Sequence, residues 1–185
     1  MATNLEKHNS SLLIGVTDYI SLKLAINSAE NGKRVWHISM KPIEKLPENI
    51  SQPCREVLQL ITFIYLSTYD DLIKHFNSIH KWKHLPQLII LKDFENYCDI
   101  LDSNYNSLKS AYLCATLLDS VSYISRKSQS HTSVMVCCSS LEGTEKIQVL
   151  YDMYFDICVN KEEFQDEDVL LHFIWNSLIK TNDVS

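Results

Sequence analysis

Glycine is scarce in this chain. Only Gly15, Gly32 and Gly143 occur among 185 residues, and the closest two lie 17 positions apart. A P-loop needs two glycines within about six residues, and a dinucleotide-binding fingerprint needs three, because the backbone must approach the phosphates closely. The sequence therefore argues against any mechanism that holds phosphate in a glycine-rich loop.

Long apolar runs and an excess of basic charge are also missing. No apolar run approaches the about 20 residues of a membrane span, and residues 1–10 lack the apolar stretch of a secretory signal. The formal net charge is −6 and the pI is about 5.6, whereas nucleic-acid-binding domains are usually basic. We expect a soluble, intracellular protein without membrane contact, in which only a local basic face could meet nucleic acid.

No pair of cysteines has the CxxC spacing of a zinc site or a redox centre. The six cysteines are therefore expected to be reduced, apolar core residues: Cys54, Cys98, Cys114, Cys137, Cys138 and Cys158. His80 and His84 have the helical spacing of a zinc pair, but no carboxylate or cysteine flanks them. We expect exposed histidines at a helix end and no bound metal.

What is present is an alternation of short apolar runs and helical patterns, in a chain whose length predicts one domain. The apolar runs predict strands at Ser11–Ile14, Val35–Ser39, Leu60–Leu66, Leu88–Leu91 and Ser133–Cys138. Helices are predicted at Ser21–Ala29, from Leu72 to Ile79 after a capping box at Thr68–Asp71, and at Ser107–Lys127. This order predicts an α/β fold with a mostly parallel central sheet flanked by helices.

Two later segments, Phe155–Val159 and Val169–Trp175, are also apolar. They predict late strands, which we expect at an antiparallel edge of the sheet. The chain 1–185 is then one domain, with a core of about residues 11–160 and a C-terminal edge segment at 161–185.

Several segments, in this order along the chain, resemble those of one family. They read LLIGVTDYISLKLAINSAENGKRVWHIS, LPQLIILKDFENY, AYLCATLLDSVSYISRK, VMVCCS and VLYDMYFDICV. The first resembles the opening of RecA-type ATPases, in which a strand ending in glycine leads into the P-loop. The second resembles their second nucleotide-binding strand. Over roughly residues 11–160 the chain is similar to the SWIM-domain-protein-associated recombinase paralogue, the RecA-like subunit of the metazoan Shu complex.

The resemblance implies a RecA-like P-loop NTPase core and a nuclear role in DNA repair by homologous recombination. Members of this family are described as ATPases that also bind DNA. They pair with a zinc-binding SWIM-domain protein, and the pair supports assembly of strand-exchange recombinase filaments on single-stranded DNA. We therefore expect a SWIM-domain zinc-finger protein and a recombinase as partners, and contact with single-stranded DNA mainly through the complex.

The residues that this family uses on phosphate are not retained. In a P-loop, glycines, a lysine and a Ser or Thr surround the β-phosphate and Mg²⁺ at a helix N-terminus. Aligned from Gly15, the chain has Ile20 in place of the second glycine, Ser21 in place of the lysine and Leu22 in place of the hydroxyl residue. Asp18 adds a negative charge where phosphate would lie.

The metal-site and catalytic acids differ as well. The resemblance implies an Asp directly after the strand LIIL, but Lys92 stands there, and Asp93 follows one position later, on the opposite face of a continued strand. Lys41 stands near the place of the catalytic Glu. We therefore expect a pseudo-ATPase with no catalytic residue and without ATP or Mg²⁺ as cofactor. The alternative is an atypical ATP-binding NTPase of the same fold, which retains Gly15, Lys23 and Asp93.

Basic residues gather at the ends of two predicted helices. Cations at helix ends are expected from the helix dipole alone, and the sharper alternative is a weak phosphate-contacting patch with Trp82 and Tyr123 as stacking groups. The candidate DNA contacts are Lys81, Lys83, Arg126 and Lys127. The short segment Ser139–Glu145, which contains Glu142 and stands where recombinases have DNA-binding loops, argues against strong binding by the chain alone.

The predicted helix Ser107–Lys127 has two apolar stripes, more than one sheet face needs. One stripe contains Leu108, Ala111, Tyr112, Ala115 and Leu118, and the other contains Leu113, Leu117, Val121 and Ile124. Either the C-terminal segment covers the additional stripe or a partner protein does. The stretch VLLHFIW, which ends in Trp175, leaves a similar choice between a closing edge strand and a docking strand.

Overall fold

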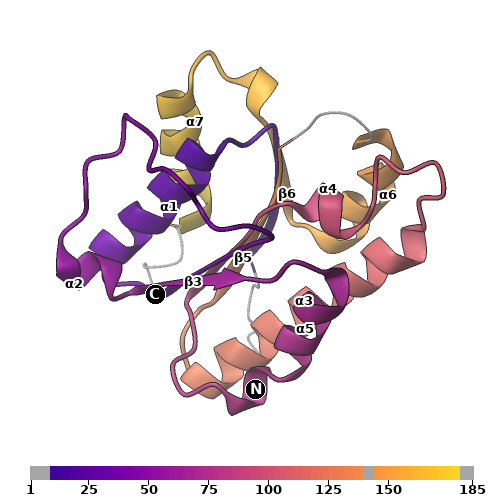
Figure 1. Ribbon diagram of the computed structural model, residues 1–185, viewed down its shortest axis with the longest axis horizontal. Coiled ribbons are helices and arrows are strands. Elements are labelled where there is room, and N and C mark those ends of the chain that lie inside the picture. Colours follow the sequence, from indigo (N-terminus) through magenta and orange to yellow (C-terminus); the bar gives the residue numbers. More distant parts are fainter. Residues whose placement is uncertain (1–8, 140–143, 180–185) are drawn as a thin grey trace, which may run out of the picture.

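The computed structural model describes residues 9–139 and 144–179, and a six-stranded sheet forms its centre (Figure 1). All neighbouring strands are parallel, in the order β3-β2-β4-β5-β1-β6. The strands are β1 (Asn9–Ile14), β2 (Val35–Ser39), β3 (Ile61–Tyr65), β4 (Leu88–Leu91), β5 (Ser133–Cys138) and β6 (Ile157–Asn160). The expected α/β fold with a central parallel sheet is confirmed.

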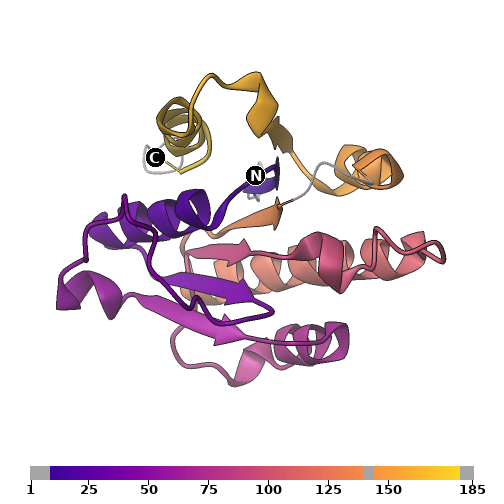
Figure 2. The same ribbon diagram turned by 45° about the horizontal axis from the view of Figure 1, so that its top comes forward.

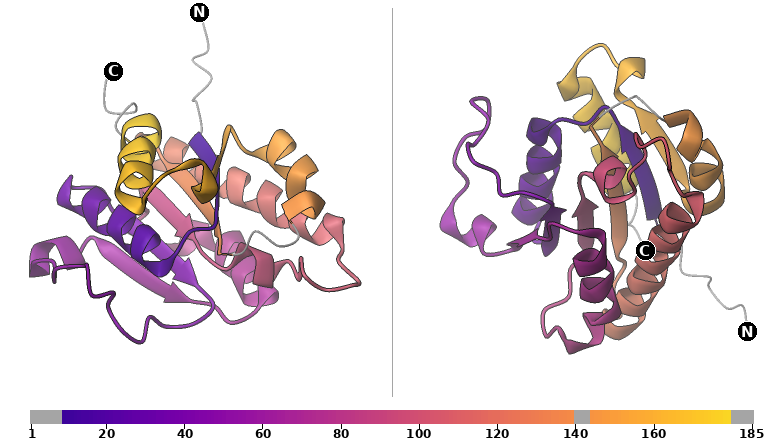
Figure 3. Two further views of the ribbon diagram at one scale, coloured as in Figure 1. Left: turned by 90° about the horizontal axis from the view of Figure 1, so that it is seen from above. Right: turned by 45° about the vertical axis from the view of Figure 1, so that its right-hand side comes forward.

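Helices cover both faces of the sheet. They are α1 (Asp18–Glu30), α2 (Arg55–Leu58), α3 (Tyr69–Asn77), α4 (Phe94–Tyr97), α5 (Ser107–Ser128), α6 (Thr144–Tyr154) and α7 (Glu167–Ile174), with short helical turns η1 (Ile79–Lys81), η2 (Lys161–Glu163) and η3 (Trp175–Ile179). One apolar layer lies between the sheet and α1 with α7, and another between the sheet and α3 with α5 (Figures 2 and 3). Among the residues described, no helix is long and apolar enough to cross a membrane.

The strands β2, β4 and β5 have the bounds that their apolar runs predict. Their residues are buried on both faces of the sheet: Val35 packs in the α1 layer, whereas Trp36 and Ile38 pack in the α3–α5 layer. Strands that are apolar on both faces are typical of parallel sheets covered by helices on either side. Because their apolar runs have no polar interruption, the bounds of these three strands could be predicted correctly from the sequence.

The predicted strand Val169–Trp175 is wrong, because this segment forms α7. Asp166 caps the helix, its Oδ1 accepting a hydrogen bond from the Val169 N–H (2.8 Å). Leu170 and Ile174, four residues apart, are fully buried in the α1 layer. An apolar stretch of this length is compatible with either a strand or a buried helix, and here the cap at Asp166 and the packing against α1 favour the helix.

The predicted antiparallel edge is also wrong. β6 pairs with β1 in parallel, with Ser11 opposite Ile157. A parallel pair requires a crossover that returns the chain to the starting edge of the sheet, and α6 lies in the crossover between β5 and β6. The helical character of residues 144–154 was missing from the predicted elements.

All six cysteines are free thiols, and four of them are buried as expected. Burial raises the pKa of Cys98 and of Cys114 to about 12, so both thiols stay protonated at neutral pH. Cys54 and Cys158 are exposed, because they lie before the short helix α2 and on the edge strand β6. The expectation that every cysteine lies in the core is wrong for these two.

The parallel strands start at one edge of the sheet and end at the other, called here the amino edge and the carboxyl edge. Ligands of open parallel sheets bind outside the carboxyl ends of the strands. Gly15 follows β1, Lys41 lies beyond β2, and Lys92 follows β4, so the fold brings all three to the carboxyl edge.

Candidate functional site

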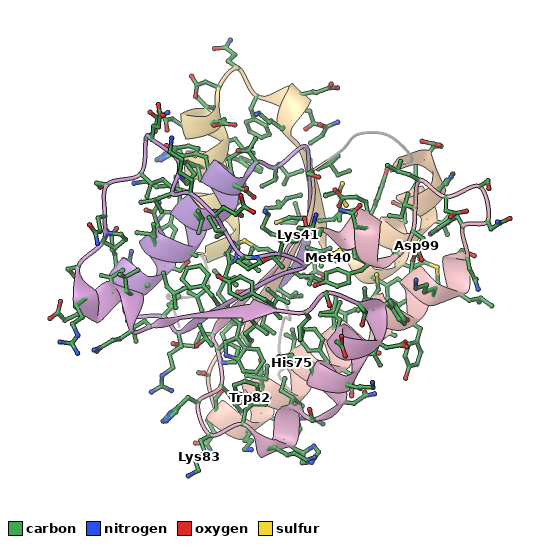
Figure 4. The ribbon with its side chains drawn as sticks, in the orientation of Figure 1. Met40, Lys41, His75, Trp82, Lys83 and Asp99 are labelled. Carbon is green, nitrogen blue, oxygen red and sulfur yellow. The ribbon has the colours of Figure 1, made fainter. Side chains whose placement is uncertain are left out.

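A pocket of about 840 Å³ opens at the carboxyl edge. It lies among the connections that follow β1, β2 and β4, and Ser139, beyond β5, also lines it. This is the place where the resemblance implies a nucleotide. Met40 and Lys41 mark it in Figure 4.

The connection from β1 to α1 is only three residues long, Gly15 to Thr17. Gly15 has a positive φ of 76°, and its N–H donates to the Cys138 carbonyl oxygen (2.9 Å). A Cβ atom at Gly15 would lie 3.2 Å from Lys161 Cβ, so both the backbone conformation and the space favour glycine. A P-loop places four residues between its two glycines, and this turn is too short to contain them.

Helix α1 begins three residues earlier than predicted. Thr17 caps it, with Oγ1 accepting a hydrogen bond from the Ile20 N–H (3.5 Å). The early start places Ser21 and Leu22 inside the helix, where both are buried. Neither lines the pocket, so the two positions that align with the P-loop lysine and hydroxyl residue belong to the core.

An ion pair joins the N-terminus of α1 to the end of β4. Lys92 Nζ donates to Asp18 Oδ1. The Lys92 residue is only 9% exposed, whereas the Asp18 side chain is 58% exposed. The charges are reversed relative to a P-loop site, in which the cation belongs to the helix and the acid follows the strand. Because the first turn of a helix attracts negative charge, Asp18 takes the position that a phosphate would need.

Further carboxylates surround this end of α1. Thr17 Oγ1 donates to Glu167 Oε1 (3.2 Å), which also accepts from Lys161 Nζ (2.6 Å). The Tyr19 hydroxyl donates to Asp168 Oδ1 (3.5 Å), and burial together with Asp168 raises the pKa of Tyr19. These contacts connect α7 to the start of α1.

Asp93 holds two connections of the carboxyl edge together. It precedes α4 with a left-handed backbone (φ 60°), and its Oδ2 accepts a hydrogen bond from the Met40 N–H (3.0 Å). Lys41 follows on the exposed rim of the pocket, and its carbonyl oxygen accepts from Ser39 Oγ (2.9 Å). Asp93 thus lines the pocket, but its carboxylate is hydrogen-bonded to the backbone of Met40. The cation Lys41 stands near the place of the catalytic acid.

The residues at this edge do not fit a nucleotide phosphate with Mg²⁺. A phosphate site needs free backbone N–H groups and cations at the helix N-terminus, but Asp18 and Glu167 present carboxylates there. A Mg²⁺ site needs oxygen ligands, but Lys92 follows β4 and Asp93 is bonded to the Met40 N–H. Within residues 9–139 and 144–179, no group of three or more His, Cys, Asp or Glu side chains is placed to hold a metal ion.

Two buried polar side chains near the pocket were not expected from the sequence. Glu95 of α4 is 4% exposed, and its Oε1 accepts from the Ser139 N–H (2.9 Å) and from the Ser139 hydroxyl. His37 of β2 is fully buried, 3.4 Å from Ser21 Oγ and beside the ring of Phe63. Burial lowers the pKa of His37 to about 4, although Asp93 acts in the opposite direction. No sequence pattern reveals these contacts, because the partners are 16 or more residues apart.

The candidate DNA contacts lie near the amino edge, away from the pocket. Lys81, Lys83, Arg126 and Lys127 are all exposed. Lys127 Nζ donates to the His80 carbonyl oxygen (3.3 Å), so the fold brings the two basic segments together. Lys127 also lies over the Tyr123 ring (5.4 Å to its centre).

The expected exposure of His80 and His84 is confirmed, whereas the acidic segment Ser139–Glu145 lies partly outside the described residues. His80 lies in η1 and His84 beyond it, so the two do not share one α-helix and lack the spacing of a zinc pair on a helix. Both are exposed, as expected. Of the segment Ser139–Glu145, residues 140–143, including Glu142, lie outside the described residues.

One stripe of α5 is buried and the other is partly exposed. Leu113, Leu117, Val121 and Ile124 lie in the core, whereas Leu108 and Tyr112 are 76% and 55% exposed. Of the two alternatives for this stripe, cover by the C-terminal segment is wrong as far as residue 179, because α7 packs against α1 on the other face of the sheet. The neighbouring helix α6 also carries two exposed apolar side chains, Val149 and Met153.

Models of known protein families give no match to this chain, and curated proteins give none either. The sequence resemblance and the geometry of the carboxyl edge are therefore the grounds on which a function can be proposed.

Proposed function

We propose that this protein is a non-catalytic RecA-like paralogue that pairs with a SWIM zinc-finger protein. The pair supports assembly of strand-exchange recombinase filaments on single-stranded DNA during homologous recombination and DNA repair in the nucleus. The resemblance over residues 11–160 supports this role, as does the parallel sheet, in which the segments that resemble nucleotide-binding strands end at one edge. The ion pair between Asp18 and Lys92 is the observation that supports a non-catalytic role. It places a carboxylate where a phosphate needs a cation, and a lysine where Mg²⁺ needs an acid.

The purified protein is expected not to bind ATP specifically. In isothermal titration with ATP and Mg²⁺, no binding tighter than a Kd of about 100 μM, or about −5.5 kcal/mol, should be observed. The alternative, an atypical ATP-binding NTPase, is favoured by one observation: the pocket is of a size that small ligands use. Tighter binding, accompanied by release of inorganic phosphate, would favour that alternative over a pseudo-ATPase.

The exposed stripe of α5 is the surface that we assign to the SWIM-domain partner. Buried apolar anchors dominate the energetics of protein interfaces, so Leu108→Asp combined with Tyr112→Asp is expected to weaken pairing by about 2 kcal/mol or more, roughly 30-fold. Co-expression with a SWIM zinc-finger protein followed by size-exclusion chromatography measures this. The unaltered chain should elute with its partner, and the double variant should elute apart from it.

A matched control is Val169→Asp on α7, which is 49% exposed and lies on the other face of the sheet. This variant should retain the complex. Separate elution of the unaltered chain and its partner would contradict the proposed pairing, whereas loss of the complex in the Val169 variant alone would move the interface to the α1–α7 face.

A further inference from the structure

The strand β6 ends the six-stranded sheet, and its outer edge is open. β6 pairs with β1 on one side, and no strand within the described ranges, 9–139 and 144–179, pairs with its other side. Alternate residues of an edge strand point their N–H and C=O groups away from the sheet. Lysine, proline or a bulge usually protects such an edge, but β6 reads ICVN and contains no charged residue and no proline. The edge can therefore accept a further strand.

The two faces of the sheet differ beside β6. Val159 is buried in the apolar layer to which α7 also contributes, and successive side chains of a strand point to opposite faces. Cys158 therefore points to the other face, and it is exposed. A strand added at this edge would meet α7 on one face and the surroundings of Cys158 on the other.

The flank of α7 that borders β6 is apolar. Val169 and Phe173, one helical turn apart, are 49% and 39% exposed. Asp168 lies on the flank that faces α1, where its Oδ1 accepts from the Tyr19 hydroxyl (3.5 Å), so Val169 and Phe173 lie on the flank away from α1. Phe164, in the connection from β6 to α7, packs its ring centre 5.2 Å from that of Phe173. These contacts place an exposed apolar ridge next to β6.

The Cys158 face of the edge is acidic. Partial burial raises the pKa of the Cys158 thiol, and the Glu163 and Asp152 carboxylates near it act in the same direction. Both carboxylates are exposed. The two lysines nearest in the sequence, Lys146 and Lys161, donate instead to a backbone carbonyl oxygen (2.7 Å) and to a carboxylate of α7 (2.6 Å). This face therefore attracts cations from outside the chain.

A second copy of this protein does not fit the edge. Pairing of two β6 strands would bring the carboxylates of both copies together, and like charges across paired strands are destabilising. The occupant that the charges favour is a strand with cations on one face and apolar side chains on the other.

We propose that the open edge of β6 binds an extended segment of a partner protein in which apolar side chains alternate with lysine or arginine. The backbone of the segment pairs with β6, its apolar side chains pack on Val169 and Phe173, and its cations lie beside Asp152 and Glu163. Strand addition of this kind takes its affinity from main-chain hydrogen bonds and its specificity from alternate side chains. The edge is separate from the α5 stripe that we assign to the SWIM-domain partner, so the inference goes beyond the proposed function.

The test uses the purified full chain and a labelled nine-residue peptide of alternating valine and arginine, followed by fluorescence anisotropy. A Kd of roughly 100 μM or tighter is expected. Glutamate in place of every arginine, or serine in place of every valine, should weaken binding about tenfold or more, because each removes what one face of the strand recognises.

Cys158 reports where the peptide binds. N-ethylmaleimide alkylates the exposed thiol of the free chain, and the peptide at about ten times its Kd should slow this reaction roughly tenfold, because only the unbound fraction reacts. Cys54 is also exposed but precedes α2, so it is the internal control and should react at an unchanged rate. Mass spectrometry of the digested chain measures both thiols.

N-methylation of the peptide tests strand pairing itself. One peptide carries a methyl group on every valine nitrogen and another on every arginine nitrogen, so each has lost the donors along one of its two edges. One of the two should bind and the other should not, and the one that binds reports whether the added strand is parallel or antiparallel to β6. Equal binding of both would show that the peptide does not pair as a strand.

Removal of the apolar ridge is expected to weaken peptide binding. Val169→Ser combined with Phe173→Ser should raise the Kd about fivefold or more, since buried apolar anchors dominate interfaces. The matched control, Leu108→Ser combined with Tyr112→Ser on α5, removes two exposed apolar side chains elsewhere and should leave the Kd within about twofold. Circular dichroism checks the fold of every variant, and the peptide controls decide the proposal if a variant unfolds.

Removal of the two carboxylates tests the cationic face. Asp152→Asn combined with Glu163→Gln should raise the Kd about fivefold and reduce its dependence on salt. The control, Glu44→Gln combined with Asp119→Asn, neutralises two exposed carboxylates elsewhere, makes the same change of net charge and should leave the Kd within about twofold.

Three further results overturn the proposal: no binding of the valine–arginine peptide, equal protection of Cys54 and Cys158, or equal losses in a variant and its control. The co-elution experiment with the SWIM-domain protein depends on α5 and is independent of all of them. A failure of strand addition at β6 can thus be distinguished from a failure of the proposed pairing.

Discussion

Acidification from pH 7 to about pH 4 is expected to destabilise this protein by about 3 kcal/mol or more. Burial lowers the pKa of His37 and of His75 to about 4, from the ordinary value of 6.5. Both rings are therefore neutral in the folded state, and both gain a proton in the unfolded state as the pH falls below 6.5. Since the unfolded state then binds more protons, stability is complete above about pH 6.5 and declines towards pH 4.

The size of this effect follows from the two pKa values. A difference of about 2.5 pH units corresponds to about 3 kcal/mol for His37, which is fully buried. The contribution of His75 is somewhat smaller, because 8% of this residue is exposed and the Trp82 ring that packs against it is itself partly exposed. Together they approach the whole stability of many domains, which is about 5–15 kcal/mol.

Urea unfolding at several pH values between 7 and 4.5, followed by circular dichroism, measures the loss. His75→Phe keeps an aromatic ring among Trp36, Phe76 and Trp82, and it should remove nearly half of the pH dependence while the protein remains folded. His37→Phe, placed beside Phe63, should remove the larger part. A pH dependence that is unchanged in both variants would show that other groups cause the acid sensitivity.

Removal of the Asp18 carboxylate is expected to cost about 2 kcal/mol, more than replacement of its partner Lys92. Asp18→Asn leaves the Lys92 ammonium group almost buried without its counter-ion. Lys92→Met instead places an apolar chain of similar length in the same surroundings and leaves an exposed carboxylate in the first turn of α1, where the helix dipole favours it. We expect that change to remain within about 1 kcal/mol of the unaltered protein, because well-packed apolar residues often replace buried ion pairs without loss.

Urea unfolding at pH 7 of both single variants and the double variant gives the coupling between the two side chains. The double variant should be more stable than Asp18→Asn alone, since it no longer contains the uncompensated cation. If Lys92→Met proves more destabilising than Asp18→Asn, packing of the Lys92 stem rather than the ion pair holds the end of β4.

The regular elements were predictable where one local signal was strong. The strands β2, β4 and β5 follow from apolar runs without polar interruption, and Thr68 caps α3 as expected, with Oγ1 accepting from the Asp71 N–H (3.1 Å). The start of α1 was predicted three residues too late, although Thr17 followed by Asp18 is itself a signal for a helix N-terminus. Of the two predicted late strands, Phe155–Val159 corresponds to β6 (Ile157–Asn160), whereas Val169–Trp175 is wrong. The apolar run in α7 has no period that separates a strand from a buried helix.

The candidate site, too, could be predicted only where a local sequence signal exists. The absence of a glycine-rich phosphate loop could be predicted, because glycine and lysine are either present at the required spacing or absent from it. The partner of Lys92 could not be predicted, because Asp18 lies 74 residues away in the sequence and no local pattern links the two residues. The cations near the amino edge could be predicted only as two separate groups, because the contact that joins them, from Lys127 Nζ to the His80 carbonyl oxygen, spans 47 residues.

The sequence by itself determined that this protein has buried parallel strands, helices between them and no glycine-rich phosphate loop. Each of these properties depends on residue types at short spacing, where side-chain period and backbone freedom act locally. Only the tertiary structure decided which charges meet: an acid and a lysine of reversed sign at the carboxyl edge, and, near the amino edge, a lysine at the end of α5 that reaches the basic segment around η1. Electrostatic interactions depend on distance and burial in space, and the order of strands in the sheet sets both.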